Sequence, residues 1–201
     1  MMPSEIRRRR AQTAKLVVTG PFDAGKTTLI ATISDSTVLT TERSLTSAEG
    51  DGSSQRTTVA MDFGRIGVEP DLALFLFGTP GQERFEFMWD ILAEGMLGFV
   101  LVVDATRPAT LEESAQLRRR FTAAADVPHV VAINKAGPGD DHDKLIGRVR
   151  AELHLPSEVP VVVADARDED DVRRVVLTFL RRVLEHTRQR SPLLTSVGGA
   201  G

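Results

Sequence analysis

The chain has 201 residues, 41% of them hydrophobic, which is long enough for one domain with a buried core. Its 25 basic and 28 acidic residues give a net charge of -3, which offers no electrostatic argument for binding nucleic acid or an anionic membrane. The chain contains no cysteine, which excludes disulfides, thiolate metal sites and cysteine nucleophiles. The longest apolar runs are too short to cross a bilayer, so we expect a cytoplasmic protein with no integral membrane segment.

The two ends of the chain differ in composition from the middle. Residues 1–12 contain "RRRR", and residues 189–201 end in "SVGGAG". Neither segment has the apolar residues needed to pack against a core. The sequence therefore predicts a flexible basic tail over 1–12, one domain over 13–188, and a second flexible tail over 189–201.

The first predicted strand, 14–20, leads directly into "GPFDAGKT", residues 20–27. This segment fits the phosphate-binding pattern G-x-x-x-x-G-K-[ST]. Glycines let backbone N–H groups approach an anion, and the N-terminus of the following helix adds its positive end. We expect Lys26 to reach the β- and γ-phosphates and the Thr27 hydroxyl to ligate Mg²⁺. The competing interpretation is a glycine-rich turn with a surface lysine.

Residues 57–68 alternate with period two, as expected of a half-covered strand, with Thr58, Ala60 and Asp62 on one face. The turn signal "EPD" separates them from the apolar run 72–77, so the two segments are predicted to form an antiparallel hairpin. Further apolar runs at 97–103, 129–133 and 159–163 are typical of strands covered on both faces.

The clearest helical pattern lies near the C-terminus, where apolar residues repeat at helical spacing from Val172 to Leu184. Four arginines are expected on the other, solvated face of this helix: Arg173, Arg174, Arg181 and Arg182. The alternation of strands and helices predicts an α/β fold with a mostly parallel sheet, one antiparallel strand at its edge, and helices on both faces.

Three further motifs follow the phosphate loop: "RTTVAMDFG" at 56–64, "FGTPGQERF" at 77–85 and "INKAG" at 133–137. Their order and spacing over 14–185 resemble the Ras-like small GTPases. The resemblance is closest to the prokaryotic group related to the gliding-polarity GTPases and to the β-subunit of the signal-recognition-particle receptor. It implies a P-loop NTPase with a six-stranded Ras-like sheet. It also implies a molecular switch that binds GTP or GDP with Mg²⁺ and hydrolyses GTP slowly.

The resemblance assigns roles in the phosphate loop and in both switch regions. Thr58, with Thr57 as the alternative, would join Thr27 on Mg²⁺ when the γ-phosphate is present. The Gly81 N–H would contact that phosphate, and Gln82 would orient the attacking water. Nucleotide contacts are implied for Gly20, Phe22, Asp23, Ala24, Gly25, Lys26, Thr27, Thr28, Thr58, Gly81, Asn134, Lys135, Ala166 and Arg167.

The resemblance also assigns roles around the base. Asn134 and Lys135 would frame the base, the Ala166 N–H would contact guanine O6, and Arg167 would cover the ring. Gly137 stands where the family has the aspartate that accepts hydrogen bonds from guanine N1 and N2. Asp140 or Asp141 could replace that carboxylate, or both could be exposed loop residues or the start of the next helix.

Gly78 stands where the family has an aspartate that supports Mg²⁺ through a water molecule. Asp62 and Asp104 are candidate substitutes, although a capping or surface role is the favoured interpretation of each. Phe22 stands where many Ras-like proteins have a small residue, and its ring would crowd an arginine brought in by an activating protein. We therefore hypothesise that Arg56 is an internal arginine finger, against the alternative of a solvated loop arginine.

The segment 83–92, "ERFEFMWDIL", is unusually aromatic for this chain. Its apolar residues are Phe85, Phe87, Met88, Trp89, Ile91 and Leu92. Since one helix cannot bury all of them, those left outside would form a surface for a protein effector or regulator; the alternative places most of them in the core. Two rival functions remain open: a pseudo-GTPase scaffold that does not hydrolyse nucleotide, and an ATP-using P-loop protein.

Overall fold

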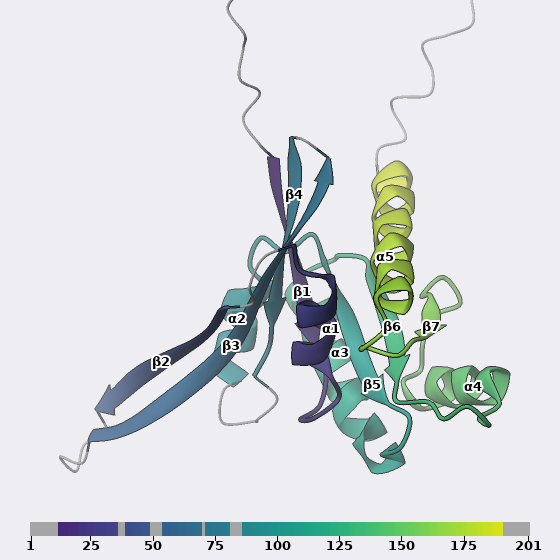
Figure 1. Cartoon of the computed structure of the whole chain (residues 1–201), viewed down its shortest axis with the longest axis horizontal. Helices are drawn as coiled ribbons and strands as arrows, with labels where there is room; N and C mark the ends of the chain where they lie inside the picture. Colours follow the sequence, from purple (N-terminus) through teal and green to yellow (C-terminus); the bar gives the residue numbers. More distant parts are fainter. Residues whose placement is uncertain (1–11, 36–38, 49–53, 70, 81–85, 191–201) are drawn as a thin grey trace, which may run out of the picture.

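A computed structural model describes residues 12–35, 39–48, 54–69, 71–80 and 86–190, with the backbone alone at 39–48, 54–60 and 86–87. Its centre is a seven-stranded sheet in the order β2-β3-β4-β1-β5-β6-β7 (Figure 1). The strands are β1 (Gln12–Thr19), β2 (Leu39–Ala48), β3 (Ser54–Glu69), β4 (Leu72–Gly78), β5 (Gly98–Asp104), β6 (His129–Asn134) and β7 (Val161–Val163). Every neighbouring pair is parallel except the two pairs that contain β3.

Helices cover both faces of the sheet, and each face has its own core. The helices are α1 (Lys26–Ile33), α2 (Glu86–Ala93), α3 (Leu111–Ala124), α4 (His142–Glu152) and α5 (Glu169–Arg190), with a 3-10 turn, η2 (Pro108–Thr110). One core joins α1 and α5 to the sheet through residues such as Ile30 and Phe179. The other joins α2, α3 and α4 through residues such as Leu92 and Phe121. All residues of β5 and β6 are buried, as their Val-rich sequences predict.

The predicted class of fold is confirmed, and the sheet has one strand more than the six expected. The additional strand is β2, which pairs with residues 54–63 of β3, so the antiparallel strand β3 lies one position in from the edge. The sequence of β2, "LTTERSLTSA", contains no apolar run that would mark it as a strand. Only residues 63–69 of β3 pair with β4, and Figure 1 shows the β2–β3 pair extending away from the rest of the sheet.

The end of α1 holds the free edge of β3. The Asp35 N–H donates to the Arg65 carbonyl at 2.8 Å, and the Arg65 N–H donates to Ser34 Oγ at 3.0 Å. The Asp35 carboxylate accepts a further hydrogen bond from the Gly67 N–H. These bonds satisfy backbone groups that β2 does not reach. They also fix β3 beside α1, which places Asp62 near the start of that helix.

The C-terminal helix differs from the prediction at two residues, Arg182 and Leu184, and Leu184, at the end of the predicted apolar stripe, is 58% exposed. Val172, Val175 and Phe179 are buried as expected. Arg182, however, is only 9% exposed, so the expected solvated position for this arginine is wrong. It follows Phe179 by three residues and therefore lies on the same face of α5. No helix in the described part of the chain is long and apolar enough to cross a membrane.

Candidate functional site

The loop between β1 and α1 requires glycine at both ends of its motif. Gly20 has φ 149° and Gly25 has φ 104°, a region that side chains rarely adopt. A Cβ at Gly20 would lie 2.2 Å from the Val102 carbonyl oxygen, and one at Gly25 would lie 2.2 Å from Asn134 Nδ2. The two glycines therefore let the loop close onto β5 and β6, with the N-terminus of α1 directly after it.

Lys26 begins α1 and is only 7% exposed. Its Nζ donates to the carbonyl oxygens of Gly20 and Pro21, both at 2.7 Å. Burial lowers the pKa of Lys26 to about 8, although the carboxylates of Glu113 and Asp62 oppose the shift. Because burial disfavours the charged ammonium, an anionic ligand beside Lys26 would stabilise it strongly.

A carboxylate from β3 meets the second residue of α1. Thr27 Oγ1 donates to Asp62 Oδ2 at 2.5 Å. A Cβ at Gly78 would lie 3.1 Å from Asp62 Cβ and 3.2 Å from Asp62 Oδ2. Asp62 thus occupies the space beside Gly78, in hydrogen-bond contact with the first turn of α1.

Asp104, the other candidate substitute, has a different position. It is 2% exposed and accepts hydrogen bonds from Thr106 N at 2.9 Å and Thr106 Oγ1 at 2.6 Å. It also pairs with Lys135 Nζ at 2.9 Å, and Lys135 in turn donates to the Asp23 carbonyl at 2.6 Å. Asp104 therefore closes an Asx turn with Thr106 and positions Lys135 against the phosphate loop.

Asn134, at the end of β6, joins the two halves of the site. It is 5% exposed, its Nδ2 donates to the Ala24 carbonyl at 2.9 Å, and its Oδ1 accepts from the Ala166 N–H at 2.9 Å. Thr32 Oγ1 adds a bond to the Ala166 carbonyl at 2.7 Å. The Ala166 N–H that the resemblance assigns to guanine O6 is thus engaged by Asn134 in this conformation.

A carboxylate also lies beside Gly137. The Gly137 N–H donates to Asp140 Oδ2 at 2.7 Å, and a Cβ at Gly137 would lie 3.5 Å from that oxygen. Asp141 instead caps α4 by accepting from Lys144 N at 3.1 Å. Of the two candidates for the missing base-reading carboxylate, Asp140 is the one adjacent to position 137.

Arg167 is held by its neighbour Asp165. Its Nε and Nη2 lie 3.0 and 2.6 Å from the two carboxylate oxygens, a bidentate pair that fixes the plane of the guanidinium. Hydrogen bonds from Arg167 lower the pKa of Asp165 to about 2.

Phe22 in the phosphate loop and Thr28 in the first turn of α1 are both exposed. Arg107 Nη1 donates to the Phe22 carbonyl at 3.1 Å and so holds this side of the loop.

Of four further predicted residues, two are not described and two are described by their backbone alone. Gly81 and Gln82 lie outside the described residues. Arg56 and Thr58 are described by their backbone, which pairs with Thr46 and Ser44 in the β2–β3 ladder. Because a strand rises about 3.3 Å per residue, the backbone of Thr58 lies about 13 Å along β3 from Asp62. The described structure therefore does not bring Thr58 to Thr27.

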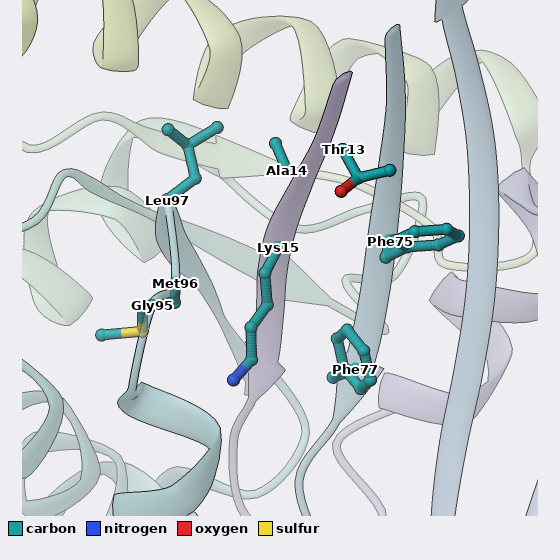
Figure 2. A pocket seen from close by; sticks show the side chains of 8 residues that line it. All are labelled: Thr13, Ala14, Lys15, Phe75, Phe77, Gly95, Met96 and Leu97. Atoms are coloured by element: carbon teal, nitrogen blue, oxygen red, sulfur yellow. The ribbon is translucent and has the colours of Figure 1, made fainter. Parts of the chain in front are cut away.

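Helix α2 is anchored to the sheet by hydrogen bonds that involve Trp89 and the C-terminal end of the helix. Trp89 is buried and its Nε1 donates to the Pro80 carbonyl at 3.2 Å. Lys15 Nζ donates to the carbonyls of Ile91 and Glu94, at 3.3 and 2.8 Å, at the C-terminal end of α2. Figure 2 shows Lys15 beside Phe77 in the hollow of about 500 Å³ on this face.

The predicted aromatic contact surface is therefore divided. Trp89 and Leu92 belong to the core, whereas Ile91 is 64% exposed. Phe85 lies outside the described residues, as does the side chain of Phe87.

The described residues contain no cluster of three or more His, Cys, Asp or Glu positioned to hold a metal ion. The Thr27 hydroxyl and the Asp62 carboxylate are nonetheless hard oxygen donors in contact with each other. Mg²⁺ takes few protein ligands and completes its shell with water and phosphate oxygens, so this pair fits Mg²⁺.

A glycine loop, a buried lysine and a threonine–carboxylate pair at the carboxyl end of a parallel sheet define a P-loop nucleotide-binding protein. A family model described as "Conserved hypothetical ATP binding protein" matches residues 38–186. The chain belongs to this family.

Several relatives extend the comparison. The uncharacterized protein MJ1339 of Methanocaldococcus jannaschii is 32% identical over 126 residues, which is 63% of this chain and 72% of that protein. The intraflagellar transport protein 22 homolog of Xenopus tropicalis is 25% identical over 90% of this chain and 96% of its own length. The Ras-related protein Rab-8B of Bos taurus is 24% identical over 93% of this chain and 86% of its own length. Similarity over nearly the whole chain supports a Ras-like kind of P-loop protein.

Proposed function

We propose that this protein is a GTP-dependent switch of the prokaryotic Ras-like kind, which binds GTP or GDP with Mg²⁺ and hydrolyses GTP slowly. The Thr27–Asp62 contact carries the proposal, because it supplies the carboxylate that Gly78 lacks. If the phosphate loop lacked that carboxylate, the rival interpretation as a scaffold that does not hydrolyse nucleotide would be favoured. With it, the hydroxyl that ligates Mg²⁺ is oriented from β3 instead of from the end of β4.

Phosphate and metal are assigned to the start of α1. The Lys26 ammonium would turn from the loop carbonyls to the β- and γ-phosphates, and the Thr27 hydroxyl would hold Mg²⁺ with Asp62 behind it. Bound Mg²⁺ neutralises charge on the phosphate oxygens during phosphoryl transfer. Loss of these ligands on hydrolysis would release the two switch regions.

Guanine is assigned to the loop after β6. The Asp140 carboxylate can accept hydrogen bonds from guanine N1 and N2, which are donors. Adenine presents an unprotonated N1 at the same edge, and a carboxylate there would repel it. Asp140 therefore favours GTP over the ATP that the family description names.

The hydrolytic step is assigned to Gln82, which would orient water, and to Arg56, which would stabilise the charge of the transition state. Thr58 would reach the metal only after this part of β3 leaves its pairing with β2, which would make the β2–β3 ladder sensitive to the γ-phosphate. Single-turnover hydrolysis by Arg56→Ala should be at least about tenfold slower. An unchanged rate would remove Arg56 from the mechanism.

Nucleotide competition tests the proposal directly. Purified protein is loaded with fluorescent GDP, and GTP, GDP, ATP and ADP are titrated against it with and without Mg²⁺. Displacement by guanine nucleotides at concentrations at least about tenfold lower supports the proposal. Preference for adenine nucleotides would assign the protein to an ATP-using class.

Phosphate release separates a switch from a scaffold. Wild-type protein should release the γ-phosphate of GTP slowly, and Gln82→Leu should bind GTP equally well but release less phosphate. If the wild type and Gln82→Leu both bind GTP without hydrolysis, the protein is a nucleotide-holding scaffold.

A further inference from the structure

A second pocket lies at the opposite end of the sheet from the phosphate loop. His129 begins β6 at this pocket, whereas Asn134 ends the same strand at the nucleotide site. The pocket has a volume of about 270 Å³ and is lined by α3, α5 and the segments 125–128 and 156–159. It is separate from every residue assigned to nucleotide or Mg²⁺.

Four basic side chains line this pocket, and in each of them one buried nitrogen lacks a hydrogen-bond partner in the described structure. These atoms are Arg118 Nε, Arg182 Nε, His129 Nε2 and His186 Nε2, and none has a hydrogen-bond partner among the residues that the structure describes. A buried polar atom without a partner costs about 1–3 kcal/mol, and more when its group is charged. Because all four atoms surround one pocket, a single polar ligand could contact them together.

Neither arginine is paired closely with an anion among the residues that the structure describes. Arg182 is 9% exposed, and within the described part of the chain it makes one loose ion pair, 3.7 Å from the largely exposed Glu185. Arg118 donates to the His154 carbonyl at 3.5 Å. Buried guanidinium groups are normally paired with an anion because desolvation of an unpaired charge is costly.

His129 is held rigidly beside the two arginines. Its ring is stacked on Phe99, with centroids 4.7 Å apart and planes at 1°, and it forms a hydrogen bond with the Val127 backbone. Burial and the charges of Arg118 and Arg182 lower the pKa of His129 to about 4, so the imidazole is neutral at pH 7. Its free Nε2 is then a hydrogen-bond acceptor.

Two carboxylates also line the pocket, and neither neutralises the arginines. Asp126 pairs with Arg190 at 2.6 Å. Glu158 is exposed and acts on His129 through its charge alone. The pocket therefore presents two guanidinium donors and imidazole nitrogens to whatever enters it.

We propose that this pocket is a second ligand site that takes a small oxyanion of the phosphate class. An ionised carboxylate offers acceptors only, which serve the two arginines but leave the neutral Nε2 of His129 without a donor. Monoprotonated phosphate also carries a hydroxyl that donates to the neutral Nε2 of His129, which sulfate lacks. The bound anion would offset the charges of both arginines.

Imidazole NMR on the full-length protein tests this site. The chain has four histidines, so inorganic phosphate is titrated into histidine-labelled protein kept in excess GDP and Mg²⁺. The His129 and His186 signals should shift saturably, whereas His142, exposed on α4, should not. The readout is specific to each residue, so it stands even if GDP does not bind.

Matched variants complete the test. Arg118→Gln should lower the affinity for phosphate at least about tenfold, because a charge-assisted hydrogen bond is lost. Arg119→Gln, its exposed neighbour on α3, removes the same charge and should leave affinity unchanged. Equal loss in both variants, equal shifts with sulfate, or no saturable shift in wild type would overturn the proposal. If Arg118→Gln does not fold, wild-type Tm decides: a saturable rise in phosphate over sulfate supports the site, and equal Tm values overturn it.

Discussion

Moving one carboxylate between neighbouring strands tests whether Asp62 replaces the family aspartate. The single variant Gly78→Asp should be destabilised, because its Cβ would lie 3.1 Å from Asp62 Cβ and 3.0 Å from Ile30 Cδ1. Two carboxylates about 4 Å apart also repel by up to about 4 kcal/mol at an effective dielectric constant of 20. Asp62→Gly removes the acceptor for Thr27 and should lower Mg²⁺ affinity about 10- to 100-fold.

The double variant Asp62→Gly/Gly78→Asp should recover much of both losses. The crowding and the repulsion both disappear, and a carboxylate again faces Thr27. Urea unfolding gives the coupling between the two sites, which we expect to be about 1–3 kcal/mol. Mg²⁺ affinity is measured from the rate at which EDTA releases fluorescent GDP. If Asp62→Gly keeps wild-type Mg²⁺ dependence, or if the double variant is no better than the sum of the single ones, Asp62 has no metal-supporting role.

Three further predictions concern the phosphate loop and the base loop. Lys26→Met should raise the free energy of unfolding of nucleotide-free protein at pH 7 by about 1–3 kcal/mol, because burial lowers the lysine pKa from 10.5 to about 8. Urea unfolding should show this advantage shrinking from pH 8 to 10.5, where unfolded wild type keeps a proton that the folded protein has lost; a constant difference would contradict the shift. Gly25→Ala should lower thermal stability by about 1–3 kcal/mol and abolish nucleotide binding, since its Cβ would meet Asn134 at a positive φ. Asp140→Ala should reduce the GTP-to-ATP preference at least about tenfold in the competition assay, whereas Asp141→Ala should lose about 1 kcal/mol of stability as a helix cap and keep the preference.

Local patterns were sufficient to predict the phosphate loop. The requirement for glycine at Gly20 and Gly25 follows from backbone conformation and close approach, which depend on a few neighbouring residues. Strands β5 and β6 were equally predictable, because burial on both faces leaves a continuous apolar run. The edge strand β2 was not, since a strand stabilised mainly by backbone pairing needs no apolar residues.

Contacts between distant segments set the limit of the sequence analysis. The alternation in β3 placed Asp62 on the same strand face as Thr58 and Ala60, but its meeting with Thr27 depends on how β3 lies against α1. Likewise, Asp140 approaches Gly137 only because the loop turns back, so that the Gly137 N–H donates to the Asp140 carboxylate. For Arg182 a signal was present: it follows Phe179 by three residues, on the apolar side of α5.

The amide of Asn134 has a consequence for redesign. Its Nδ2 donates to the Ala24 carbonyl and its Oδ1 accepts from the Ala166 N–H, so it ties the phosphate loop to the loop after β7, where we propose that the base binds. A design that aims to change base selectivity should therefore substitute Asp140 or Arg167 and keep Asn134. Substitution of Asn134 would lower the affinity for every nucleotide, whatever its base.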